Sequence, residues 1–139
     1  MKTESKNKKT IGKTILVIED ERPLVAAIEM KLEKNGLSVT TARTVEQGLC
    51  YLEDIDNIDA VWLDHYLLGK ETGLDFVAKL KSSESKWKKI PIFVVSNTAS
   101  SSNVRSYMRL GVSKYYVKAE YRLDEIIGEI KAFLDHPKD

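Results

Sequence analysis

The chain has 139 residues, a formal net charge of +1, 42% hydrophobic residues and 31% charged residues. This length and composition fit one globular domain with a sizeable core. The near-neutral charge gives no reason to expect nucleic acid as an obligatory partner, and no apolar stretch approaches the roughly 20 residues that a membrane span needs. The N-terminus has no secretory signal, and the single cysteine, Cys50, is predicted to be a packed thiol on a helix. We therefore expect a cytoplasmic protein.

Two terminal segments lie outside the predicted domain, which spans residues 14–135. Residues 1–13 carry five lysines and few apolar side chains, which is typical of a disordered basic arm. A docking or nucleic-acid role is the lesser alternative for this arm. Residues 136–139 form a short C-terminal tail.

Continuous apolar runs predict strands that are buried on both faces of a parallel sheet. Four such runs are Ile15–Ile18, Ala60–Leu63, Ile92–Val95 and Tyr115–Val117. With their flanking residues and one further short segment, the predicted strands are 14–19, 38–42, 59–63, 90–95 and 113–117.

Helical patterns lie between these strands and after the last one. The first begins near Pro23, which suits the first helical turn, and ends at Asn35-Gly36. A capping box from Thr44 to Gln47 opens the second, and the third begins near Gly73. The last two cover about 100–110 and 121–134. The alternation of strands and helices predicts a flavodoxin-like, doubly wound α/β fold with a five-stranded parallel sheet in the order 2-1-3-4-5.

Polar side chains follow four of the predicted strands at the point where each strand ends. They are Glu19 with Asp20, then Asp64, Ser96 and Lys118. The C-terminal ends of parallel strands share one edge of the sheet, so these groups should converge there. Carboxylate oxygens suit Mg²⁺, and a carboxylate can act as a nucleophile toward a phosphoryl group. Ser96 and Lys118 could then hold phosphoryl oxygens.

The motifs ILVIEDE, AVWLDHYL followed by TGLDF, IPIFVVSNTA and VSKYYVK stand in this order in the chain. Together they resemble the receiver domain of two-component response regulators, over residues 13–134. The resemblance implies that Asp64 is the phosphoacceptor and that Ser96 and Tyr115 are switch residues. Lys118 matches the lysine of the family's active site. A Mg²⁺ ion would be held by Asp20 directly, by Glu19 through water, by Asp64 and by the backbone carbonyl of Tyr66.

The sequence departs from the family pattern at several positions. The segment from Asp64 to Gly73 is one residue longer than the usual acceptor loop, with Leu68 or Gly69 where proline is typical. Ala119 follows Lys118 in place of a proline, which argues against a cis peptide there. Asn97 replaces a small residue after Ser96. These changes suggest altered kinetics rather than loss of function.

The resemblance implies a stand-alone receiver domain, without a separate enzyme domain, that takes a phosphoryl group from a histidine kinase or a histidine phosphotransfer protein. Its output surface would be helix 100–110, strand 113–117 and helix 121–134, used for a downstream protein or a phosphorylation-dependent homodimer. Exposed side chains expected on that surface are Arg105, Tyr107, Met108 and Arg109.

Three alternatives remain open on the sequence. A non-phosphorylated pseudo-receiver would be a pure interaction module, although Asp20, Asp64 and Lys118 are all present. A phosphohydrolase could use Asp64 as its nucleophile, but the short loops leave little room for a substrate-binding cap. A flavin or nucleotide binder would need glycines in the first strand–helix loop to bind phosphate, but this loop is acidic. His65 has no nearby second histidine or cysteine, so we do not expect a zinc site.

Overall fold

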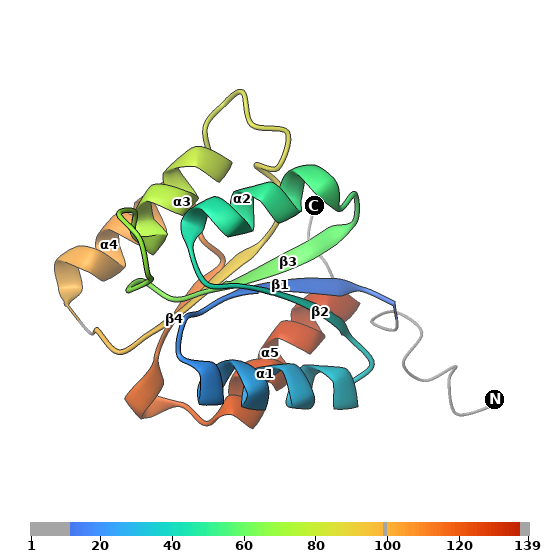
Figure 1. The fold of residues 1–139 in the computed structure, drawn as a ribbon. Coiled ribbons are helices and arrows are strands. Elements are labelled where there is room, and N and C mark those ends of the chain that lie inside the picture. The colour runs from blue at the N-terminus through green and yellow to red at the C-terminus, as the bar shows by residue number, and fades with distance from the viewer. Residues whose placement is uncertain (1–11, 99, 137–139) are drawn as a thin grey trace.

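The computed structural model describes residues 12–98 and 100–136, which form a three-layer α/β fold (Figure 1). Residues 1–11 of the predicted arm and 137–139 of the predicted tail lie outside the described residues. The elements are β1 (Thr14–Ile18), α1 (Arg22–Lys34), β2 (Ser38–Ala42), α2 (Val45–Asp54), β3 (Ile58–Leu63), α3 (Gly73–Leu80), β4 (Ile92–Ser96), α4 (Ser101–Leu110), β5 (Lys114–Val117), a 3₁₀ turn (Lys118–Glu120) and α5 (Leu123–Asp135).

All five strands are parallel and stand in the order β2-β1-β3-β4-β5, as predicted. Helices α1 and α5 cover one face of the sheet, and α2, α3 and α4 cover the other (Figure 1). None of the helices in the described part of the chain is long and apolar enough to cross a membrane.

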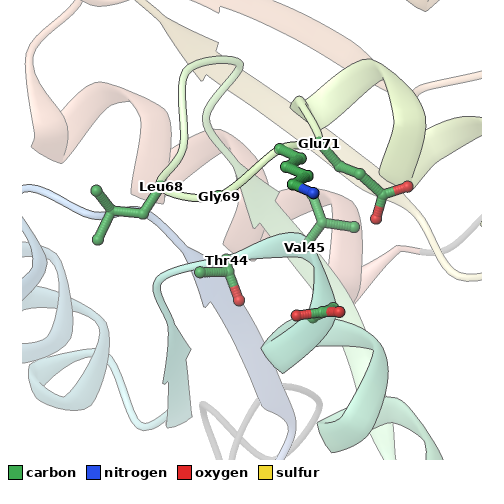
Figure 2. Close-up of a pocket in the computed structure, with 7 residues that line it drawn as sticks. Thr44, Val45, Leu68, Gly69 and Glu71 are labelled. Atoms are coloured by element: carbon green, nitrogen blue, oxygen red, sulfur yellow. The ribbon is translucent and has the colours of Figure 1, made fainter.

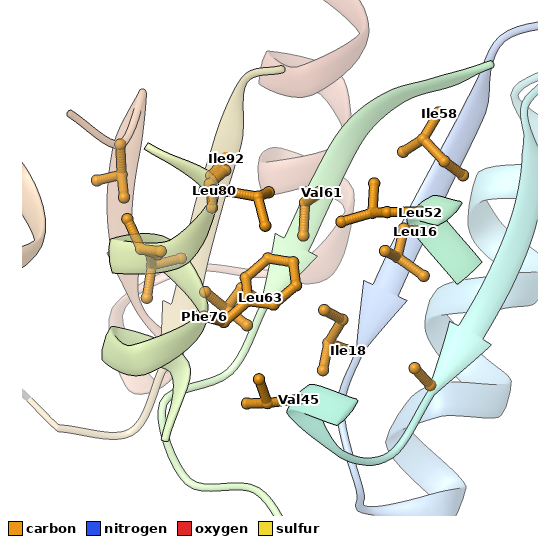
Figure 3. Packing of buried hydrophobic residues seen from close by; sticks show 14 of the residues in the cluster. Leu16, Ile18, Val45, Leu52, Ile58, Val61, Leu63, Phe76, Leu80 and Ile92 are labelled. Carbon is orange, nitrogen blue, oxygen red and sulfur yellow. The ribbon is translucent and has the colours of Figure 1, made fainter. Parts of the chain in front are cut away.

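Alternating side chains of the strands build a separate apolar core on each face of the sheet. Leu16 and Ile18 of β1 pack under α2 and α3, where Phe76 is fully buried (Figure 3). Ile15 and Val17 point to the opposite face and pack against α1 and α5. Because the central strands are buried on both faces, their sequences read as continuous apolar runs.

Local chemistry fixes most of the helix ends near their predicted positions. Pro23 is the second residue of α1, where its missing N–H costs nothing. The hydroxyl of Thr44 accepts the backbone N–H of Gln47 at 3.0 Å. The Gln47 side chain, however, accepts the N–H of Arg43 and not that of Thr44, so the predicted reciprocal capping box is incomplete. Gly111, at φ 101°, ends α4 in the left-handed region that favours glycine.

Apart from shifts of one residue at other strand ends, three further predictions about local structure differ from the structure. Strand β4 begins at Ile92 and not at Ile90, because the intervening Pro91 has no N–H to give to the sheet. Helix α5 begins two residues late because the 3₁₀ turn follows β5. Cys50 was predicted to be packed but is exposed. Helix α2 buries Val45, Gly48 and Leu52, and Cys50 lies on its other side.

Candidate functional site

Three carboxylates meet where β1 and β3 end. These strands are neighbours, with Ile18 paired to Leu63, so Glu19 and Asp20 after one strand lie beside Asp64 after the other. One oxygen from each carboxylate lies within 4.8 Å of the others. Glu19 is 1% exposed and Asp64 is 5% exposed, whereas Asp20 is half-buried. Within residues 12–98 and 100–136 this is the one group of three or more potential metal ligands.

Lys118 reaches this carboxylate group from the end of β5. Its Nζ lies 3.1 Å from Oε1 of Glu19 and 3.6 Å from Oδ2 of Asp64. Burial alone would lower the pKa of Lys118, but the carboxylates of Asp64 and Glu19 raise it above its ordinary value. The side chain therefore carries a positive charge at neutral pH.

Burial and mutual repulsion disfavour the charged forms of the two buried acids. Burial raises the pKa of Glu19, and the charge of Asp64 adds to that rise. Burial also raises the pKa of Asp64, although Lys118 and the N–H of His65 favour its charged form. A bound cation would relieve both effects, because it stabilises the ionised carboxylates.

Backbone groups fix the orientation of the buried carboxylates. The N–H of His65 donates to Oδ1 of Asp64 at 2.8 Å, which leaves Oδ2 on the side of Lys118. The N–H of Glu21 donates to Oε2 of Glu19 at 3.1 Å. Both oxygens of Glu19 therefore have protein partners, one from the backbone and one from Lys118.

Ser96 and Tyr115 meet at the β4–α4 loop. Ser96 is the last residue of β4 and is fully buried. Its hydroxyl accepts the N–H of Thr98 at 3.4 Å, and the hydroxyl of Tyr115 donates to the carbonyl of Thr98 at 2.8 Å. One loop residue thus connects the two predicted switch residues.

The acceptor loop after Asp64 folds against the start of α2. Leu68 pairs with Thr44 in a parallel bridge, and the two segments enclose a hollow of about 380 Å³ (Figure 2). Gly69 has φ 94°, which a proline cannot adopt, so the missing proline follows from the path of the longer loop. Tyr66 is 59% exposed on this loop. Within the described residues no peptide bond is cis, so the peptide after Lys118 is trans, as its sequence suggested.

Two side chains near the site differ from the sequence expectations. Tyr107 was expected on the exposed face of α4 but is fully buried, while Arg105, Met108 and Arg109 are exposed. His65 is 8% exposed, and its Nδ1 lies 2.6 Å from the hydroxyl of Tyr107. Burial lowers the pKa of His65 and strongly raises that of Tyr107. The sequence contained only one indication of this contact, which was the presence of an aromatic residue, Tyr107, on a predicted helix.

Comparisons with known proteins agree with this geometry. A family model described as the response regulator receiver domain matches residues 15–131. The chain is 28% identical over 124 residues to the phosphate regulon transcriptional regulatory protein PhoB of Pseudomonas aeruginosa. This match covers 89% of this chain and 52% of that protein. It is 28% identical over 106 residues to the chemotaxis protein CheY1 of Helicobacter pylori, covering 75% of this chain and 83% of that one. The chain spans about half the length of the transcriptional regulators that it matches.

Solved structures show the same fold. The phosphorylated cyanobacterial phytochrome response regulator RcpA has a TM-score of 0.79 at 24% identity, over 91% of this chain and 96% of that chain. The Mn²⁺-bound form of the response regulator Rcp1 has a TM-score of 0.76 at 20% identity, over 91% and 97%.

Proposed function

The chain belongs to the response regulator receiver domain family, and we propose that it accepts a phosphoryl group on Asp64 with the help of a divalent cation. The phosphodonor is a histidine kinase or a histidine phosphotransfer protein. The observation that carries the proposal is the position of the Asp64 carboxylate, between two acidic side chains and the ammonium of Lys118. A receiver domain of a two-component system needs this combination of nucleophile, cation ligands and counter-charge.

The donor set fits Mg²⁺. All the side-chain ligands are carboxylates, which are the hard oxygen donors that Mg²⁺ prefers, and few of them are needed because this ion keeps several waters. Asp20, the most exposed of the three, would contact the ion directly, with Asp64 and the backbone carbonyl of Tyr66. Glu19 would act through water. The ion, when bound, would offset the negative charge that builds up during transfer.

The chain's own residues position and neutralise the transferred group. In the transfer, the P–N bond of a phosphohistidine breaks and a P–O bond to a carboxylate oxygen of Asp64 forms. Lys118 pairs with one phosphoryl oxygen, because its ammonium already lies 3.6 Å from Oδ2 of Asp64. The buried hydroxyl of Ser96 donates to another oxygen after it turns away from Thr98. The catalysis concerns the chain's own phosphorylation and dephosphorylation, not the turnover of a separate substrate.

Output passes through the surface of α4, β5 and α5. When Ser96 turns toward the phosphoryl group, Thr98 and then Tyr115 lose their present hydrogen bonds and move. The exposed Arg105, Met108 and Arg109 of α4 would present the changed surface to a downstream protein or to a second copy of the chain. We propose that the protein works in the cytoplasm together with its phosphodonor.

Labelling with acetyl phosphate tests the proposal and the role of the cation. With Mg²⁺ the intact mass should rise by one phosphoryl group, and a chelator should abolish the rise. Asp20→Asn should weaken Mg²⁺ binding at least about tenfold, as loss of even an outer-shell partner commonly does. Asp56→Asn removes one exposed carboxylate from the α2–β3 loop and should change neither result. An unchanged mass in the wild type would instead favour a pseudo-receiver that acts only through protein contacts.

A further inference from the structure

A hydrogen bond joins the residue after Asp64 to the middle of helix α4. Nδ1 of His65 lies 2.6 Å from the hydroxyl of Tyr107, and both side chains are buried. Their rings meet edge to face, with centroids 5.6 Å apart and planes at 81°. The acceptor loop is therefore tied to α4 without passing through Ser96.

The first residue of α3 leaves room for this contact. A Cβ on Gly73 would lie 2.7 Å from the hydroxyl of Tyr107 and 2.6 Å from the carbonyl oxygen of Asp64. The N–H of Gly73 also donates to the carbonyl of His65 at 3.0 Å. The hydroxyl of Tyr107 is thus enclosed where β3 ends and α3 begins, next to the acceptor.

The ring of Tyr107 also contacts Tyr115, one of the two proposed switch residues. The rings of Tyr107 and Tyr115 have centroids 5.6 Å apart and planes at 51°. Tyr115 is bound to the carbonyl of Thr98, whose N–H is bound to Ser96. Tyr107 therefore touches both routes from Asp64 to α4, one through His65 and one through Ser96 and Tyr115.

We propose that His65 and Tyr107 are positioning residues that hold α4 in the unphosphorylated arrangement, an inference that rests on the proposed function. His65 is fixed at both ends, because its N–H donates to Oδ1 of Asp64 and its ring is bound to Tyr107. When Ser96 and Tyr115 move, the ring of Tyr107 packed against Tyr115 moves with them. The His65–Tyr107 hydrogen bond opposes this movement and so favours the unphosphorylated state.

Thermodynamic linkage makes the proposal measurable. If the bond stabilises the unphosphorylated state, its loss must raise the affinity for a ligand that favours the phosphorylated state. Tyr107→Phe removes the hydroxyl and keeps the ring. With Mg²⁺ present, this variant should bind beryllofluoride, a phosphoryl mimic, about twofold to tenfold more tightly, which is the range that one ordinary buried hydrogen bond provides. Amide NMR signals of residues 101–110 should also move, without the mimic, toward their wild-type beryllofluoride positions.

Tyr116→Phe is the matched control. Tyr116 is also fully buried, and its hydroxyl donates to Glu129 at 2.7 Å, but it packs in the core on the α1 and α5 side. This control should lose stability without a change in beryllofluoride affinity. His65→Phe should reproduce the effect of Tyr107→Phe, and the double variant should add little, because both changes break the same bond.

The outcomes separate the two proposals. If wild-type residues 96–122 do not respond to beryllofluoride, the proposed function fails and the inference fails with it. If the wild type responds but Tyr107→Phe binds the mimic with unchanged or lower affinity, the inference alone is wrong, and the hydrogen bond serves only to stabilise the fold.

Discussion

Charged side chains lie at both ends of the parallel strands, but they have different partners at the amino end, called here the amino edge, and at the carboxyl end, called the carboxyl edge. At the amino edge, the carboxylate of Asp59 accepts the N–H of Thr14 at 2.8 Å. The ammonium of Lys81 donates there to the carbonyls of Lys88 and Ile90 at 2.8 and 2.9 Å. At the carboxyl edge, three carboxylates meet the ammonium of Lys118, and burial raises the pKa of Glu19 and Asp64. At the amino edge the charged groups bond to backbone groups, whereas at the carboxyl edge three carboxylates crowd together, which is the unfavourable negative charge that a bound cation would offset.

The largest difference between the edges should appear when a lysine is replaced. Lys118→Met removes the ammonium beside Asp64, so labelling by acetyl phosphate should slow about 10²-fold or more, as when one preorganised electrostatic contact is lost. Lys81→Met is the matched change at the amino edge and should leave the rate unchanged. Rates can be followed by intact mass over time. Equal slowing in both variants would contradict the comparison.

In stability tests we expect the opposite ranking of the same two variants, with the larger loss in Lys81→Met. Lys81→Met leaves the exposed carbonyl of Lys88 and the half-buried carbonyl of Ile90 without their donor, which should cost about 0.5–1.5 kcal/mol in the free energy of unfolding, the range of an ordinary hydrogen bond. Urea denaturation of the metal-free protein gives this value. A loss smaller than that of Lys118→Met would mean that the amino edge is not the stabilising one.

A smaller effect concerns the pH dependence of stability. Because the pKa of Asp64 is raised in the folded chain, the folded form binds a proton more readily than the unfolded chain does. Its ionisation therefore lowers stability as the pH rises from the ordinary value of 3.8 through the folded pKa. Asp64→Asn should raise the Tm of the metal-free protein by a few degrees at pH 7. For a domain of this size, a change of 1 kcal/mol in the free energy of unfolding shifts the Tm by about 3–5 °C. The gain should vanish near pH 4, and a gain that is the same at both pH values would contradict this explanation.

The alternation of strands and helices predicted a parallel sheet, and the flavodoxin-like pattern supplied its strand order. The meeting of Glu19, Asp20, Asp64 and Lys118 was predicted from their positions directly after the strands. Continuous apolar runs identify central strands, and parallel strands bring the residues after their ends to one edge. These inferences do not depend on where any side chain points. The starts of β4 and α5 were predicted two residues too early, because Pro91 and the turn at Lys118–Glu120 act locally.

The contacts around Tyr107 could not be predicted in this way. Tyr107 was read as part of an exposed helix face, and His65 was considered only as a zinc ligand, which its surroundings argued against. Their contact depends on the space left by Gly73 and on how α4 docks against the sheet. This contact joins residues 42 positions apart, so the periodic pattern of apolar residues cannot predict it. The exposure of Cys50 was missed for a related reason, since a short helix can be read with its buried face rotated.

Phosphoryl incorporation into three proteins, compared side by side, tests the central claim most directly. The wild type, Asp64→Asn and Asp59→Asn would be incubated with acetyl phosphate and Mg²⁺ and measured by intact mass. Asp64 and Asp59 lie at opposite ends of the same strand region, and an asparagine at position 59 can still accept the N–H of Thr14. We predict one added phosphoryl group on the wild type and on Asp59→Asn, and none on Asp64→Asn. No addition to the wild type, or equal addition to Asp64→Asn, would contradict the assignment of Asp64 as the phosphoacceptor.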